Sequence, residues 1–112
     1  ISKHLIRKYG SRAHKVARMT QENSAWAQRL VEKYPFIQAE VIYQVREEMA
    51  MTVRDVLARR IRLEIMDWEA TQEALPIVAS LMAQELGWTP TQKQQQIDDY
   101  QAQLQSFMKS AE

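Results

Sequence analysis

Residues Ala39–Leu63, AEVIYQVREEMAMTVRDVLARRIRL, are the stretch from which the fold can be predicted. Apolar residues recur every four positions through its first half, which is the spacing of a helix face: Ile37, Val41, Val45 and Met49, with Ile42 beside them. The polar residues between them are expected to form the solvated side of the same helix: Glu40, Gln44, Glu47 and Glu48. The pattern therefore predicts an amphipathic helix with one buried stripe.

The second half of the stretch predicts a separate helix that begins at Thr52. The Thr52 hydroxyl can accept a backbone N–H of the first turn, and Asp55 occupies the third position, where an acidic residue suits a capping box. Four apolar residues of this helix are expected to point inward: Val53, Val56, Leu57 and Ile61. Its outer side would carry Arg54, Arg59, Arg60 and Arg62. Arg59 follows Asp55 by one turn, so the two can form an ion pair.

The composition limits both the fold and the kinds of site that the chain can form. At 112 residues it can bury one core, and it has no cysteine for a disulfide or a thiolate metal site. Gly10 and Gly87 are its two glycines, so it cannot form a Gly-rich loop that cradles dinucleotide phosphates. The charge-free run at 74–84 has 11 residues, whereas a membrane-spanning helix needs about 20. We interpret the chain, which begins at Ile1, as a fragment of a longer protein.

Capping residues and helix breakers divide the N-terminal part into further helices. Two short helices, capped by Ser2 and Ser11, are expected on either side of Gly10. The apolar members of the first would be Leu5, Ile6 and Tyr9. A third helix is expected to begin at Ser24 and to stop at Pro35, because the residue before a proline disfavours helical geometry.

The C-terminal part is expected to form two longer helices. Asp67 can cap the first, which would run to Gly87 with a kink or a restart at Pro76. Thr89 and Pro90 form the preferred start of the second, as a cap followed by a proline at the first helical position. The sequence therefore predicts an all-α fold, a single compact bundle of five or six helices that forms one domain over residues 1–112.

The titratable and sulfur-bearing residues do not suggest an active site. His4 and His14 lie on the basic N-terminal helices without the acidic partners of a metal motif. Glu47 and Glu48 are neighbours on a helix and point about 100° apart, which does not suit a catalytic carboxylate pair. The six methionines are expected to fill the core: Met19, Met49, Met51, Met66, Met82 and Met108. We therefore assign no catalytic, cofactor-binding or metal-binding residue to this chain.

The formal net charge of +1 conceals a basic front and an acidic tail. Residues 1–20 carry six Lys or Arg and no acid, whereas residues 67–112 carry two against seven acids. The two ends could attract each other across the domain, or the front could meet an anionic partner. One helix face carries Arg12, Lys15 and Arg18, as in a helix-turn-helix DNA-binding motif. This face has no aromatic or amide side chain that could contact the edges of DNA bases. The alternative function is thus a nucleic-acid-binding or protein-interaction module, with nucleic acid the less favoured partner.

The arginines after Asp55 admit three interpretations. They could form ion pairs within the domain, with Asp55, Glu64 and acids of neighbouring helices. They could instead form a docking surface for another domain of the parent chain, since planar guanidiniums bind carboxylates and backbone carbonyls in bidentate geometry. The third interpretation is a contact with anionic lipid.

The residue 39–63 stretch resembles the C-terminal helical domain of FAD-dependent, quinone-linked glycerol-3-phosphate dehydrogenases of the mitochondrial type and of bacteria. The family pattern runs roughly AEV-x-Y-x-V-R-x-E-x-A-x-T-x-x-D-V-L-x-R-R-T-R-L, and Ile61 stands here where the family usually has Thr. HLIRKYGSRAHKV at 4–16 and ALPIVASLMAQELGW at 74–88 extend the resemblance to both sides. It covers nearly the whole chain, with an uncertain alignment near residues 22–36.

The resemblance implies an accessory domain that is inactive by itself. In the family, FAD, glycerol 3-phosphate and the hydride transfer belong to an N-terminal flavin-binding region and its substrate domain, which match no position here. The catalytic FAD and substrate domains of the parent chain are therefore the expected partner, with a second subunit or the membrane surface as alternatives. A cytoplasmic parent that is peripheral to the membrane is expected. Five matching positions are predicted interdomain contacts: Arg59, Arg60, Arg62, Arg46 and Glu48.

Overall fold

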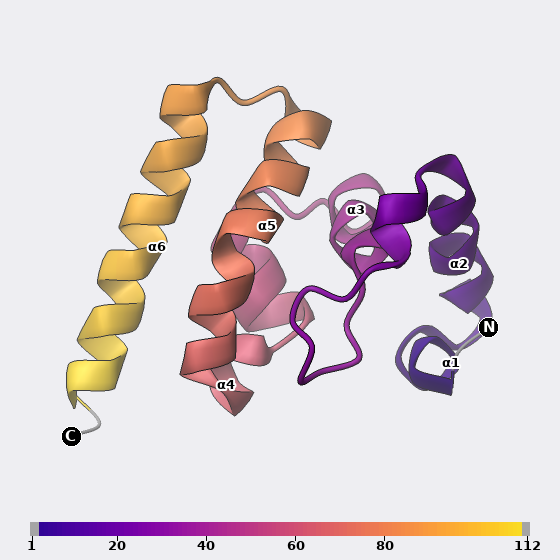
Figure 1. The fold of residues 1–112 in the computed structure, drawn as a ribbon, viewed down its shortest axis with the longest axis horizontal. Helices are drawn as coiled ribbons and strands as arrows, with labels where there is room; N and C mark the ends of the chain where they lie inside the picture. Colours follow the sequence, from indigo (N-terminus) through magenta and orange to yellow (C-terminus); the bar gives the residue numbers. More distant parts are fainter. Residues whose placement is uncertain (1–2, 111–112) are drawn as a thin grey trace.

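The computed structural model describes residues 3–110, and helices make up most of that range (Figure 1). The six α-helices are α1 (Lys3–Tyr9), α2 (Ala13–Glu22), α3 (Gln38–Glu48), α4 (Leu63–Met66), α5 (Trp68–Leu86) and α6 (Pro90–Ser110). Two 3₁₀ turns, Gly10–Arg12 and Ser24–Ala27, and one π-helical segment, Asp55–Arg60, complete the helical part of the described chain. The predicted all-α bundle of five or six helices is confirmed.

The helices pack in a row along the long axis of the molecule. Figure 1 shows α1 and α2 at one end, α3 in the middle, and the antiparallel pair α5 and α6 at the other end. Contacts run in the same order, from α1 to α2, α2 to α3, α3 to α5 and α5 to α6. One core follows this row, and it includes Val16 of α2, Ile42 of α3, Leu75 of α5 and Leu104 of α6. The helix α3 is therefore enclosed from two sides.

The central position of α3 overturns the prediction that its polar residues form a solvated side. Glu40 has 0% of its surface exposed and Gln44 is also buried, whereas Glu47 is exposed as expected. A helix packed between two neighbours has little surface left for water, so part of its polar face faces protein instead. At the other end of α3, Met49 takes a left-handed conformation (φ 60°) and is 79% exposed, so it does not continue the buried stripe.

The predicted second helix of the central stretch forms, but it is π-helical over Asp55–Arg60. The Ile61 N–H donates to the Val56 carbonyl at 2.8 Å, which is the i to i+5 bond of this geometry. In an α-helix, residues five apart would point about 140° apart, and Val56 and Ile61 could not both face the core. The wider turn allows both to be buried, and the four predicted inward residues all are: Val53, Val56, Leu57 and Ile61.

The N-terminal helices form where expected, with different ends. Gly10 has φ 56° and separates α1 from α2, as predicted. Ser11 does not cap α2, because Gly10–Arg12 is a 3₁₀ turn and Arg12 precedes the helix without a side-chain cap. Of the apolar members of α1, Leu5 is buried and Ile6 is exposed. The predicted cap at Ser2 lies outside the described residues.

No helix forms at the predicted position from Ser24 to Pro35. Asn23 accepts a hydrogen bond from Ala25 N and begins a 3₁₀ turn, after which the chain forms a loop that turns back on itself. The loop is closed by backbone hydrogen bonds from Leu30 N to Phe36 O and from Gln38 N to Gln28 O, both 2.9 Å. Its apolar side chains still enter the core: Trp26, Leu30, Val31 and Phe36. These side chains are buried although they belong to a loop, so their burial does not follow a helical spacing.

The C-terminal helices begin and end at the predicted residues. Asp67 accepts from Ala70 N at the start of α5, and Gly87 ends it with φ 71°. Of the kink or restart predicted at Pro76, the restart is wrong, since α5 is continuous across this residue, and the kink stays a prediction; Pro76 lies on the exposed side. Thr89 accepts from the backbone N–H of the residue three positions later and begins α6. Burial on both sides of Pro76 outweighs the one backbone hydrogen bond that a proline removes.

The prediction that the methionines fill the core holds for two of them. Met19 and Met82 are buried, whereas Met49, Met51 and Met66 are exposed. The side chain of Met108 lies outside the described part. Met49 and Met51 lie in the connection between α3 and the π-helical segment, and Met66 is the last residue of the short helix α4.

Candidate functional site

Four of the five predicted contact residues line one surface pocket of about 460 Å³. We call it the arginine pocket and define it by its lining residues: Lys8, Tyr9, Arg12, Tyr43, Gln44, Glu48, Arg59, Arg60 and Arg62. The fifth, Arg46, lines a different pocket. Sequence reasoning found the arginines of the π-helical segment but missed Lys8 and Tyr9, which come from α1 and reach the pocket only through the tertiary fold.

The start of the π-helical segment is fixed by the predicted capping pair. The Asp55 carboxylate accepts from Met51 N and Thr52 N, and the Thr52 hydroxyl accepts from Asp55 N at 3.1 Å. Burial alone would raise the pKa of Asp55, but these hydrogen bonds and the charge of Arg59 hold the pKa below its usual value. Arg62 ends the segment in the left-handed conformation, with φ 64°. Arg59 and Arg60 are thus held on a turn that is anchored at both ends.

The cations that line the pocket differ in the partners that they have. Arg12 donates to Glu48 Oε1 at 2.9 Å, and the Tyr43 hydroxyl donates to the same oxygen at 3.4 Å. Arg60 donates to the carbonyl of Glu48 at 3.2 Å, and its own carbonyl accepts from Lys8 Nζ at 2.8 Å. Burial of the ammonium lowers the pKa of Lys8, with Glu40 opposing this effect and Arg62 adding to it. The pocket therefore holds five cations and one carboxylate.

Beneath the pocket, the buried carboxylate of Glu40 holds the side chain of Tyr9, which lines the pocket. Glu40 accepts from Ile37 N at 2.7 Å, from the Tyr9 hydroxyl at 2.9 Å and from His4 Nε2 at 3.1 Å. Burial and the neighbouring Glu40 charge raise the pKa of Tyr9, so its hydroxyl stays protonated and remains a donor. The cluster joins α1 to α3. Only the glutamate half of a capping box is present, because Ile37 has no side-chain acceptor, so the sequence carried no capping-box signal for this contact.

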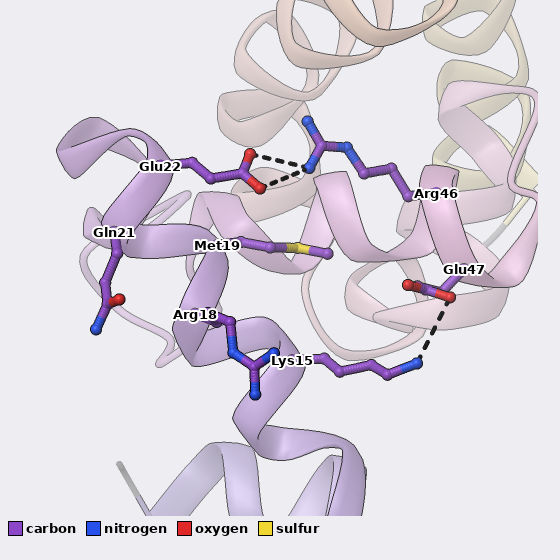
Figure 2. Close-up of a pocket in the computed structure, with 7 residues that line it drawn as sticks. All are labelled: Lys15, Arg18, Met19, Gln21, Glu22, Arg46 and Glu47. Carbon is purple, nitrogen blue, oxygen red and sulfur yellow. Dashed lines mark hydrogen bonds and ion pairs between the residues drawn. The ribbon is translucent and has the colours of Figure 1, made fainter.

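A second pocket, of about 520 Å³, surrounds Arg46 (Figure 2). Arg46 donates to Glu22 at 3.0 Å and to both carboxylate oxygens of Glu85, at 2.6 and 3.2 Å. These hydrogen bonds, those to Glu85 above all, raise the pKa of Arg46. Its guanidinium also lies 5.4 Å from the ring centre of Trp26. Arg46 thus binds α2, α3 and α5 together, and its role as an interdomain contact remains a prediction.

The basic N-terminal face pairs with α3. Arg12 binds Glu48, and Lys15 lies 3.9 Å from Glu47, as Figure 2 shows for the second pair. In the same view Arg18 points away from the pair of Glu22 and Arg46. Two of the three cations of the suspected helix-turn-helix face therefore have acidic partners within the domain. These two residues are paired with acids of α3 and not with the acidic C-terminal tail.

The described residues offer neither a metal site nor a membrane span. No group of three or more His, Cys, Asp or Glu among residues 3–110 could hold a metal ion. None of the helices described is long and apolar enough to cross a bilayer.

A family model, the C-terminal domain of alpha-glycerophosphate oxidase, matches residues 1–93. Among curated proteins, a probable mitochondrial glycerol-3-phosphate dehydrogenase of Dictyostelium discoideum is 39% identical over 107 residues, which is 96% of this chain and 17% of that protein. A probable mitochondrial glycerol-3-phosphate dehydrogenase of Caenorhabditis elegans is 42% identical, and the mitochondrial enzyme of Homo sapiens is 38% identical; each match covers 88% of this chain and 14% of the relative.

The chain therefore spans less than a fifth of the length of these relatives. No solved structure matches it. The matched region of the family model includes residues 39–63, whose Arg59, Arg60 and Arg62 line the arginine pocket. The chain belongs to the family of the C-terminal domain of alpha-glycerophosphate oxidase, which it shares with glycerol-3-phosphate dehydrogenases.

Proposed function

We propose that this chain is the non-catalytic C-terminal domain of an FAD-dependent glycerol-3-phosphate dehydrogenase and that it packs on the catalytic body and stabilises it. The observation that carries the proposal is a surface around the π-helical segment. Large apolar side chains are exposed at both ends of that segment: Met49 (79%), Met51 (61%), Ile65 (75%) and Met66 (50%). Exposed apolar residues next to arginines are typical of a surface that a partner covers.

The parent reaction follows from the family. Glycerol 3-phosphate is oxidised to dihydroxyacetone phosphate, FAD takes up the two electrons, and the electrons pass on to quinone. FAD does not fit this chain, because Gly10 and Gly87 cannot supply a Gly-rich phosphate loop. We assign FAD, the substrate and the hydride transfer to the remaining part of the parent, which forms the catalytic body. The domain contributes a rigid helical surface that is built around its own core.

The proposed location is a cytoplasmic parent that lies peripheral to a membrane, since quinone is a membrane-dissolved acceptor. The names of the relatives place those proteins in mitochondria. Fractionation of the source cells, followed by a salt wash of the membrane fraction, tests both parts of this proposal. A parent that stays with the membrane until the salt wash would support a peripheral contact.

The function is tested on the natural full-length parent, with and without residues 1–112. We expect the full-length protein to show a flavin absorption spectrum and glycerol-3-phosphate-dependent dye reduction. The truncated parent should lose flavin and activity at a lower temperature, because an apolar surface on its body is then exposed. The isolated chain 1–112 should be colourless and inactive.

Two results would contradict the proposal. A natural product that is scarcely longer than this chain and contains no flavin would exclude the dehydrogenase parent. A truncated parent that retains flavin and unfolds at the same temperature as the full-length protein would exclude the stabilising role.

A further inference from the structure

The arginine pocket contains two guanidiniums that make no hydrogen bond or ion pair among residues 3–110, although the charge of one of them, Arg59, acts on Asp55. Arg12 is paired with Glu48, and Arg60 and Lys8 are bonded to backbone carbonyls. Among the residues that the structure describes, no hydrogen bond or ion pair within 4 Å involves the guanidinium of Arg59 or of Arg62. Both line the pocket, where Lys8 already has a lowered pKa through burial and through Arg62. Like charges crowded into one concave site favour an anionic occupant.

The pocket already shows which anion its donors suit. Glu48 places a carboxylate there, held by a guanidinium and a tyrosine hydroxyl. A guanidinium binds a carboxylate through two parallel hydrogen bonds, so Arg59 and Arg62 each have a complete fork to offer. A phosphate dianion would also be attracted, because the five cations of the pocket outnumber its one carboxylate, so charge alone does not separate the two anions. The precedent for a carboxylate occupant is Glu48, which Arg12 and Tyr43 already bind there.

The surroundings of the pocket favour a protein as the source of these carboxylates. Met49 and Met51 precede the π-helical segment, and Ile65 and Met66 follow it, all of them exposed. A small soluble anion would leave these apolar side chains in water, whereas a protein surface would cover them together with the charges. The curated relatives continue for more than four-fifths of their length outside the matched region, so a polypeptide partner is available within a parent of that size.

We propose that the arginine pocket receives an acidic segment of the catalytic body of the same parent chain, with carboxylates bound by Arg59 and Arg62. This inference rests on the proposed function and names the chemistry of the contact. The same partner would cover the exposed apolar side chains that precede and follow the π-helical segment, and the charges fix the register in which the two surfaces meet.

Carbodiimide cross-linking of the full-length parent tests the proposal, because this reagent joins an amine directly to a carboxylate without a spacer. Lys8 lines the pocket and supplies the amine. We expect peptide mapping by mass spectrometry to find Lys8 linked to an Asp or Glu of the catalytic body. High salt should reduce the yield of this link, since the contact is an ion pair near the surface.

Two charge reversals identify the receiving residues. Arg59→Glu and Arg62→Glu should each lead to loss of the link from Lys8 to the catalytic body. Arg18→Glu, which changes the charge equally in the pocket around Arg46, should retain it. Circular dichroism of each variant establishes that its helices have formed.

Three outcomes would overturn the inference. Lys8 could be linked to acids of residues 1–112 alone; the link could survive both charge reversals; or inorganic phosphate could abolish the link where sodium chloride of equal ionic strength does not. The last outcome would make the pocket a phosphate site. In each case the proposed function stands if removal of residues 1–112 still destabilises the parent, so the two failures are distinguishable.

Discussion

The buried carboxylate of Glu40 gives the most direct test of how this domain is held together. Glu40→Ala removes the acceptor for the backbone N–H of Ile37, for the Tyr9 hydroxyl and for His4 Nε2. A buried donor left without a partner costs about 1–3 kcal/mol. His4 is partly exposed, so it can bind water instead, and two donors carry most of the loss. Removing the buried charge of Glu40 also removes its desolvation cost, which offsets a part of this loss of stability.

The expected result is a decrease in the free energy of unfolding of about 2–5 kcal/mol, a large share of the roughly 5–15 kcal/mol that domains possess. Glu40→Gln keeps one acceptor oxygen and should fall between this variant and the wild type. Glu47→Ala is the matched control, because Glu47 lies on the same helix and is exposed; its effect should stay within about 0.5 kcal/mol.

Urea unfolding of residues 1–112, followed by tryptophan fluorescence and by circular dichroism, measures these differences at constant m-value. Coincident transitions by the two probes establish two-state behaviour. A Glu40→Ala variant as stable as Glu47→Ala would refute the reasoning, because it would mean that the three donors do not depend on this carboxylate.

Three further predictions concern stability. Pro76→Ala should stabilise the domain by about 1–3 kcal/mol in urea unfolding, since Pro76 is exposed within a continuous helix and alanine restores an N–H donor; a loss of stability would show that the ring is needed. Leu104→Ala should cost about 2–5 kcal/mol by the same assay, because Leu104 is fully buried where α6 meets α5; a change below about 1 kcal/mol would place α6 outside the core. Hydrogen bonds from Ala70 N, Lys33 and a tyrosine hydroxyl lower the pKa of Asp67 from 3.8 to about 2, so the stability from this group is present above pH 4 and is lost as the pH falls toward 2. Asp67→Ala should lower the melting temperature at pH 6 and flatten its fall between pH 4 and 2; an unchanged acid profile would contradict this.

Local signals in the sequence predicted helix ends wherever one residue determines the geometry. Gly10 and Gly87 take the left-handed conformation at helix ends, and Asp67 and Thr89 cap the helices that follow. These signals depend on a few neighbouring atoms, so no tertiary information is needed to interpret them.

The incorrect predictions concern residues whose state is set by distant parts of the chain. Glu40 and Gln44 follow a regular polar spacing, but α2 and α5 enclose the helix that carries them. Trp26 and Leu30 are buried, yet a 3₁₀ turn and the loop after it bring them to the core in place of the predicted helix. Periodicity describes one isolated element and cannot report which neighbours will cover it.

The candidate site was predicted only in part, again because some of its residues come from distant parts of the chain. The run of arginines and the motif around it identified Arg59, Arg60 and Arg62. The partners that complete the pocket, Lys8 and Tyr9, are about fifty residues away in the sequence, and they reach it because α1 is held to α3 through Glu40. No pattern within one stretch contains that information.

The left-handed backbone of Arg62 has a consequence for anyone who engineers this domain. An L-residue with a side chain gives up about 1–2 kcal/mol in that conformation, and glycine would recover part of it. Selection of the isolated chain for heat resistance would therefore favour Arg62→Gly. The same change would remove one of the two free guanidiniums from the arginine pocket, so a more robust fragment would join its parent less well.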